Sequence, residues 1–166
     1  MKLSEYMKKI TAAKATGEYV GRDMVLALDC SEEGSSTAVG DYEVAGPHVE
    51  DVGASLTPTS TDKSYIYEGD STLKTSTKRG FSVTGQRIIG DGFQDFVCSH
   101  AIKYGTGSAV QRNYVYFHTG TKQGESGMVT ILTKKDGSGA ASSTADIEVE
   151  LQSCAMPEEY TYTTAG

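Results

Sequence analysis

The stretch "STLKTSTKRGFSVTG", residues 71–85, decides the fold. Its even positions carry only Thr, Lys, Ser and one Gly, so one face of a β-strand built from it is polar. Leu73, Phe81 and Val83 fall on odd positions and are expected to face a core. A strand this long with so few apolar residues fits either a sheet with one solvent-exposed face or a sheet that is built from the strands of several chains.

Composition limits the class of protein. The chain has 166 residues, which suits a single domain spanning residues 1–166. Only 37% of the residues are hydrophobic, and the formal net charge is −7. An acidic chain does not bind nucleic acid non-specifically, because phosphate contacts need clustered Lys and Arg. Three widely spaced cysteines indicate free thiols in a reducing cytosol, and not a disulfide framework.

Strand patterns recur along the chain. The expected strands are residues 23–29, 48–57, 62–69, 71–85, 109–120, 127–137 and 144–153, with a turn at Asp70. The last strand has the cleanest alternation, because its apolar residues alternate with Asp146, Glu148 and Glu150. These patterns predict a mainly β protein.

One segment has helical periodicity. In "GDGFQDFVCSHAIKYGTG", residues 90–107, Phe93, Phe96, Val97 and Ile102 recur at helical spacing, which predicts a helix over about 91–103. The expected fold is therefore an antiparallel β-sandwich or small barrel flanked by one α-helix. Residues 1–20 form an N-terminal arm, 30–50 a long acidic loop, and 155–166 an extended, poorly anchored tail.

No constellation of catalytic residues is visible. No His or Cys lies at a metal-ligand spacing from another, and no phosphate loop or nucleophile elbow occurs. We therefore expect no catalytic, metal or cofactor site, and a protein that is not an enzyme. No stretch reaches the length of a membrane span, and the first residues lack an apolar signal core, so neither membrane insertion nor general secretion is expected.

Over residues 60–166 the sequence resembles the tail tube (major tail) proteins of long-tailed bacteriophages. The resemblance is carried by "FSVTGQRI", "GDGFQDFVCSHAIKYG", "NYVYFHTG" with "KQGESGMVTI", and "DGSGAASSTADIEVELQSCAMP". It implies a structural virion protein that assembles into six-membered rings, which stack into a hollow tube through which DNA passes. An inner tube of a contractile tail fits the same patterns.

The resemblance also implies partners. They are further copies of the chain, the tape measure, tail terminator and baseplate or tip proteins, and DNA in transit. The chain would be assembled in the host cytoplasm and would reside in the virion tail. An alternative from the residues alone is a small carbohydrate- or receptor-binding β-sandwich, although the chain has no Trp for a sugar platform.

Two sets of residues are candidates for assembly. The long loop would reach a neighbouring subunit or ring, or else be disordered in the monomer; its candidates are Glu32, Glu33, Asp41, Tyr42 and Glu43. The candidates for the lumen or inter-subunit face are Lys74, Ser76, Lys78, Asp146, Glu148 and Glu150. The basic run that includes Lys74 and Lys78 is interpreted as a solvated face pairing with acids, and not as a DNA groove.

Overall fold

The structure, a computed structural model, describes residues 1–32 and 38–163. The helices of this part are α1 (Leu3–Lys9), α2 (Gly92–Val97) and α3 (His100–Tyr104), with 3₁₀ turns η1 (Gly21–Asp23), η3 (Val39–Asp41) and η4 (Gly107–Val110). The strands are β1 (Met24–Leu28), β2 (Glu43–Val44), β3 (Val49–Tyr65), β4 (Gly69–Gln86), β5 (Gln111–His118), β6 (Gln123–Ser138), β7 (Asp146–Ser153) and β8 (Glu158–Thr161).

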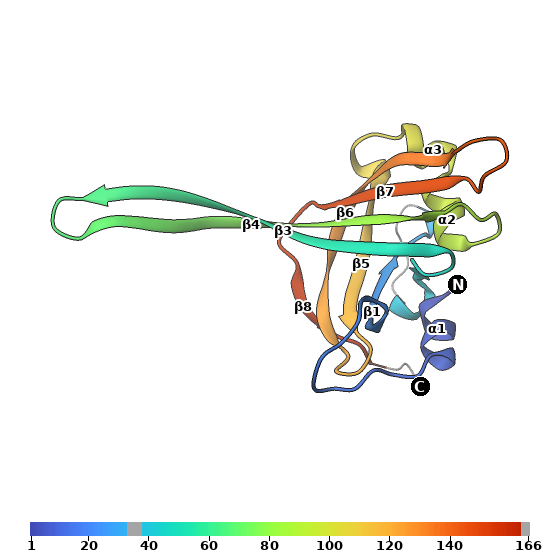
Figure 1. The fold of residues 1–166 in the computed structure, drawn as a ribbon, viewed down its shortest axis with the longest axis horizontal. Helices are drawn as coiled ribbons and strands as arrows, with labels where there is room; N and C mark the ends of the chain where they lie inside the picture. The colour runs from blue at the N-terminus through green and yellow to red at the C-terminus, as the bar shows by residue number, and fades with distance from the viewer. Residues whose placement is uncertain (33–37, 164–166) are drawn as a thin grey trace.

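The strands form one antiparallel sheet that curls over itself. Its order is β2-β1-β5-β6-β7-β4-β3, and β8 pairs with the first part of β6 (Figure 1). Phe81 of β4 makes edge-to-face contacts with Tyr114 and Tyr116 of β5, at ring-centroid distances of 5.2 and 5.0 Å, although β6 and β7 separate these strands in the sheet. The mainly β, antiparallel fold predicted from the sequence is confirmed.

Two apolar clusters fill the body. The larger lies inside the curled sheet, where Phe81, Val83 and Leu151 meet Phe93 and Val97 of α2. The smaller lies on the other side of β1 and β5, where Leu3 of α1 packs near Phe117. The N-terminal arm is therefore docked on the body through α1.

The flanking helix differs from the prediction, because two short helices replace the single helix over 91–103. Ser99 is extended and separates α2 from α3. In an unbroken helix, at 100° per residue, Ile102 would point about 180° away from Phe93. The break turns Ile102 back toward the sheet, so that both side chains are buried in the same cluster.

The two strands expected at 48–57 and 62–69 are one strand, β3, which runs through Pro58. Pro58 lies opposite Thr77 of β4, and β3 is the last strand of the sheet. A proline is tolerated in such an edge strand because its missing N–H breaks no ladder on the outer side. The turn to β4 lies at 66–68 and not at Asp70, and Gly69 ends it with a φ of +76° that favours glycine.

The C-terminal tail is better anchored than predicted. β8 pairs with Gln123–Ser126 of β6, and the buried Tyr162 ring stacks on Phe117 at 5.0 Å. The sequence shows only alternating Tyr and Thr here, which is a weak strand signal. The strand is held in place by the packing of Tyr160 and Tyr162 on the smaller cluster.

Candidate assembly surface

A long β-hairpin projects from the body (Figure 1). β3 and β4 pair with each other along their whole length, but β7 pairs with β4 only over Gly80–Gln86. At about 3.3 Å per residue, the part from Gly80 to Gly69 reaches roughly 36 Å beyond the sheet. Along this part, neither outer edge has a strand partner within the described residues. Unpaired edges of this length are open to pairing or packing by another chain.

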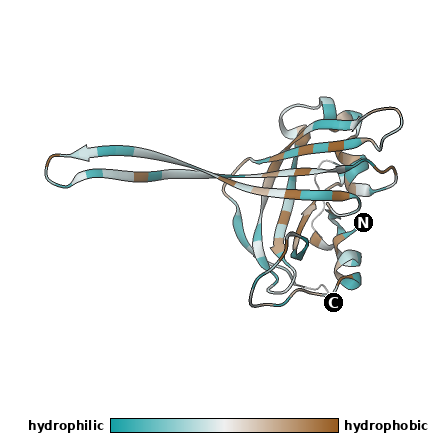
Figure 2. Cartoon of the chain, viewed as in Figure 1, coloured by the Kyte–Doolittle hydropathy of each residue, from teal (hydrophilic) through white to brown (hydrophobic). Residues whose placement is uncertain are grey.

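Apart from Leu73, the hairpin is polar between its tip and its root. Figure 2 shows pale and hydrophilic residues along most of its length. Ile66 and Tyr67 in the turn are 95% and 98% exposed, and Leu56 near the root is also exposed. Large apolar side chains so fully exposed at the end of a polar arm indicate a contact site.

A β-bulge at Thr75 divides the hairpin into two segments. Thr59 pairs with Ser76, but Ser60 pairs with Lys74, so Thr75 is the extra residue. Because side chains alternate across a strand, the bulge places Lys74 on the opposite face from Ser76 and Lys78.

The bulge also changes the position of Leu73. It lies on the opposite face from Phe81 and Val83 and is 50% exposed, so the expectation that it faces the core is wrong. The simple alternation of the sequence does not reveal this shift, because nothing in the local residue types marks the bulge.

The root of the hairpin is fixed by a polar and aromatic cluster. Arg79 donates from Nε to Glu125 Oε1 at 2.6 Å, and its guanidinium lies over the rings of Phe81 and Tyr116. Tyr114 donates to the same Glu125 oxygen, and burial, with the nearby carboxylate, raises the pKa of its hydroxyl. This network ties the root of the hairpin to β5 and β6.

The exposed face of β4, β6 and β7 carries most of the predicted lumen residues. Ser82 of β4 pairs with Glu150 and Thr84 with Glu148, so these acids share the face of Ser82. By strand alternation Asp146, Ser76 and Lys78 lie on this face too, and Lys74 does not.

Two of the three predicted acids of this face, Glu148 and Glu150, are paired with lysines. Lys134 forms an ion pair with Glu150, and Lys135 lies 3.4 Å from Glu148. The hydrogen bond from Lys134 lowers the pKa of Glu150, and Gln152 and Lys78 act in the same direction. The face is therefore locally balanced in charge and not strongly acidic.

The predicted assembly loop is partly built into the body. Tyr42 is buried in the smaller cluster, Glu43 is in β2, and Asp41 accepts a hydrogen bond from Lys2 at 2.9 Å. Glu32 is exposed at the start of the loop, and Glu33 lies outside the described residues. The described candidates after residue 38 thus serve contacts within their own chain.

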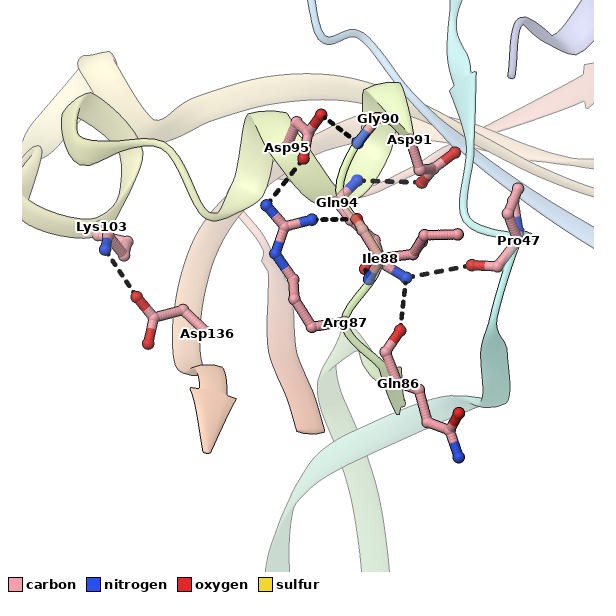
Figure 3. A network of polar contacts seen from close by, with 10 residues as sticks. All are labelled: Pro47, Gln86, Arg87, Ile88, Gly90, Asp91, Gln94, Asp95, Lys103 and Asp136. Atoms are coloured by element: carbon pink, nitrogen blue, oxygen red, sulfur yellow. Dashed lines mark hydrogen bonds and ion pairs between the residues drawn. The ribbon is translucent and has the colours of Figure 1, made fainter. Parts of the chain in front are cut away.

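Residues of α2 and α3 pack against the sheet at the end opposite the hairpin tip. Phe93, Val97 and Ile102 are buried, and Phe96 is half-buried against the same cluster. Gln94 is also fully buried, and Figure 3 shows its side chain between the chain segments before β3 and after β4.

Gln94 satisfies three backbone groups. Its Nε2 donates to the carbonyls of Pro47 and Gln86, both at 3.1 Å, and its Oε1 accepts from the N–H of Ile88 at 2.8 Å (Figure 3). Asp91 caps α2 by accepting a hydrogen bond from the N–H of Gln94.

Two ion pairs flank this network in Figure 3. Arg87 donates to Asp95 at 2.8 Å, and Lys103 donates to Asp136 at 2.6 Å. The hydrogen bond from Arg87 lowers the pKa of Asp95, and the hydrogen bond from Lys103 lowers that of Asp136.

The described part of the chain has neither a candidate metal site nor a candidate membrane-spanning helix. Within residues 1–32 and 38–163, no group of three His, Cys, Asp or Glu side chains is arranged to hold a metal ion. None of the helices in the described part of the chain is long and apolar enough to cross a membrane.

Comparison of the structure with solved structures gives two informative matches. One is a chain of the tail of an empty gene transfer agent (GTA) particle, refined with helical, C6 symmetry: the match covers 87% of this chain and 100% of that chain, with a TM-score of 0.60 and 16% identity. This chain has the fold of a GTA tail chain. A chain of the native GTA virion matches over the same shares of the two chains, with a TM-score of 0.56 and 13% identity. No protein-family model matches the sequence, and no curated protein is similar to it in sequence.

Sequence reasoning missed two features of this surface. The apolar tip could have been found, because "SYIYEG" (64–69) places Ile66 and Tyr67 in a turn between two polar strands. The root contact between Arg79 and Glu125 had no local signal, because 46 positions separate the two residues.

Proposed function

We propose that the chain is a non-catalytic structural subunit of a phage-like tail, which self-assembles into six-membered rings that stack into a hollow tube. The hairpin carries this proposal, because it extends roughly 36 Å with unpaired edges from a body that has the fold of a tail chain. A monomer gains nothing from such an arm, whereas an assembly covers its edges with other subunits. The C6 symmetry of the matching GTA tail supports a ring of six.

The exposed face of β4, β6 and β7 is the candidate for the wall of the channel. Ser76, Lys78, Asp146, Glu148 and Glu150 are its predicted members. Carboxylates paired with Lys134 and Lys135 present little net charge, so DNA in transit would meet a face with few free cations to bind phosphate. Lys74 is not part of this face, and its role is treated below.

The remaining assembly contacts follow from exposure. Glu32 and Asp41 are exposed and remain candidates for contact with a neighbouring subunit, while Tyr42 and Glu43 hold the base of the loop. Partners at the ends of the tube would be a tape measure protein, a tail terminator and a baseplate or tip protein. The site of action would be the virion tail, after assembly in the host cytoplasm.

Electron microscopy tests the proposal. The purified chain is examined by negative stain and sedimentation velocity across a concentration series. Hollow rings or tubes with a six-fold end view are expected above a threshold concentration. A chain that remains monomeric at every concentration contradicts the proposal and would direct attention to glycan binding instead.

A further inference from the structure

The tip of the hairpin combines exposed apolar side chains with acidic residues on either side. Ile66 and Tyr67 stand almost fully exposed at its end, and Tyr65 beside them is partly exposed. The flanking charges are Asp62, Lys63, Glu68 and Asp70, which leaves the tip acidic. An apolar end with an acidic collar fits a partly apolar groove with a basic rim.

A groove with these properties lies at the root of the same hairpin. Its volume is about 340 Å³, and its lining includes Leu56, Lys74, Thr77, Arg79, Met156 and Pro157. Leu56 and Met156 are 60% and 86% exposed, so the groove offers apolar surface that no part of its own chain covers within the described residues. Lys74 and Arg79 supply positive charge, although Arg79 also pairs with Glu125 of the same lining.

The position of Lys74 in this groove depends on the β-bulge. The bulge at Thr75 turns Lys74 onto the face of Leu56 and Thr77, where it reaches the groove. Without the bulge, Lys74 would share the face of Ser76 and Lys78.

Two other grooves of the body fit the acidic tip less well. The groove between α1 and the start of β3 is lined by Glu50 and Asp51 beside Arg22. The groove beside α3 contains Glu32 together with Arg112. Like charges facing Glu68 and Asp70 would oppose docking there.

The occupant cannot be the tip of the same chain. An extended hairpin holds its tip roughly 36 Å from its root, so only a second copy can bring a tip to this groove. We propose that the tip of one copy, residues 65–68, seats in the groove at the root of the hairpin of the next copy. This proposal rests on the proposed function and names the partner surface of that assembly.

The contact has a structural consequence. It joins two different surfaces of the same chain, so each bound copy still presents a free tip at one end and a free groove at the other. Such a contact extends to further copies and does not close on two copies.

Cross-linking tests the contact directly. Tyr67→Cys and Met156→Cys are combined in a Cys154→Ser background, and assembled protein is oxidised. A ladder of covalent oligomers is expected from the double variant, and mainly dimers from a mixture of the two single variants. The matched control pairs Tyr67→Cys with Ile89→Cys, which lies on an exposed loop outside the groove, and should give no ladder.

Charge reversal provides an independent test. Glu68→Lys and Lys74→Glu should each raise the threshold concentration for tube formation about tenfold, because each places like charges in contact. Combining them should bring the threshold concentration most of the way back to the wild-type value. Combining Glu68→Lys with the distant Lys122→Glu should not.

The outcomes separate the two proposals. Wild-type tubes with neither a ladder nor charge rescue would overturn the tip-to-root contact and leave the proposed function standing. A wild-type chain that forms no rings or tubes would overturn both. A ladder together with charge rescue supports both.

Discussion

Nε of Arg79 lies 2.6 Å from Oε1 of Glu125, where the hairpin leaves the sheet. Both side chains are largely shielded, and the guanidinium also covers two aromatic rings. We expect Arg79→Ala to lower the free energy of unfolding by about 1–3 kcal/mol, because it removes a charge-assisted hydrogen bond and a cation–π contact together. Urea denaturation measures this loss.

The exposed pair of Lys2 and Asp41 is the control for that experiment. Both of its side chains are about half exposed, at 52% and 53%, so Lys2→Ala should lower the free energy of unfolding clearly less than Arg79→Ala. Equal losses in the two variants would show that the root of the hairpin is not specially stabilised.

Shortening the hairpin should separate folding from assembly. Residues 58–77 are replaced by Asn-Gly, which joins the paired residues Thr57 and Lys78 by a two-residue turn. None of the residues removed belongs to either buried cluster, so the unfolding transition should remain cooperative with a similar midpoint. Tubes should be absent in negative stain. Tubes of normal length from this variant would exclude the hairpin from assembly.

The two phenylalanines of α2 should differ in their contribution to stability. Phe93 is fully buried, and Phe93→Ala should cost about 3–5 kcal/mol. Phe96 is only half-buried, packed against the cluster and lying beside Arg112, so Phe96→Ala should cost clearly less. Thermal and urea unfolding of both variants measure the difference, and the reverse order would contradict the burial seen here.

Replacing Gln94 tests the polar network at the far end of the sheet. Gln94→Ala leaves two carbonyls and one N–H without their partner, each of which costs about 1–3 kcal/mol when it stays buried. We expect a total loss of about 3 kcal/mol or more, measured by urea denaturation. Gln123→Ala, at an exposed position, is the matched control, and a similar small loss in both would contradict the network's role.

The ion pair between Arg87 and Asp95 predicts a pH dependence. The pKa of Asp95 is lowered in the folded chain, so its stabilisation is present above the unfolded pKa of about 3.9 and is lost as pH falls through the folded value. Asp95→Asn should therefore have a lower Tm than wild type at pH 6–7, and the difference should shrink below about pH 4. A constant difference down to pH 2.5 would contradict this linkage.

The sequence predicted the elements whose pattern is local. Ile147 and Val149 alternate strictly with acids, and this strand lies where it was expected. Phe93, Val97 and Ile102 of the helical stripe are buried and Phe96 is half-buried, but the stripe does not predict the break at Ser99, because the break depends on where the curled sheet lies relative to Ile102.

The features that were missed depend on contacts distant in sequence. Tyr162 is buried because its ring stacks on the ring of Phe117. Tyr42 is buried because it packs in the cluster formed with residues of β1 and α1. A consequence is that removing residues 32–46, which a free loop would tolerate, takes away β2 and should unfold the body. The candidate assembly surface was predictable only as a long polar strand, and its tip and groove needed the register of β3 and β4.

The bulge at Thr75 also affects how the hairpin can evolve. This one inserted residue reverses the side-chain alternation of the distal segment relative to the segment next to the sheet, and so decides which side chains the distal segment presents on each face. Deleting Thr75 would exchange those faces, as a whole, without altering any residue of the body. A subunit built this way can therefore alter its partner contacts by a change of length as well as by substitution.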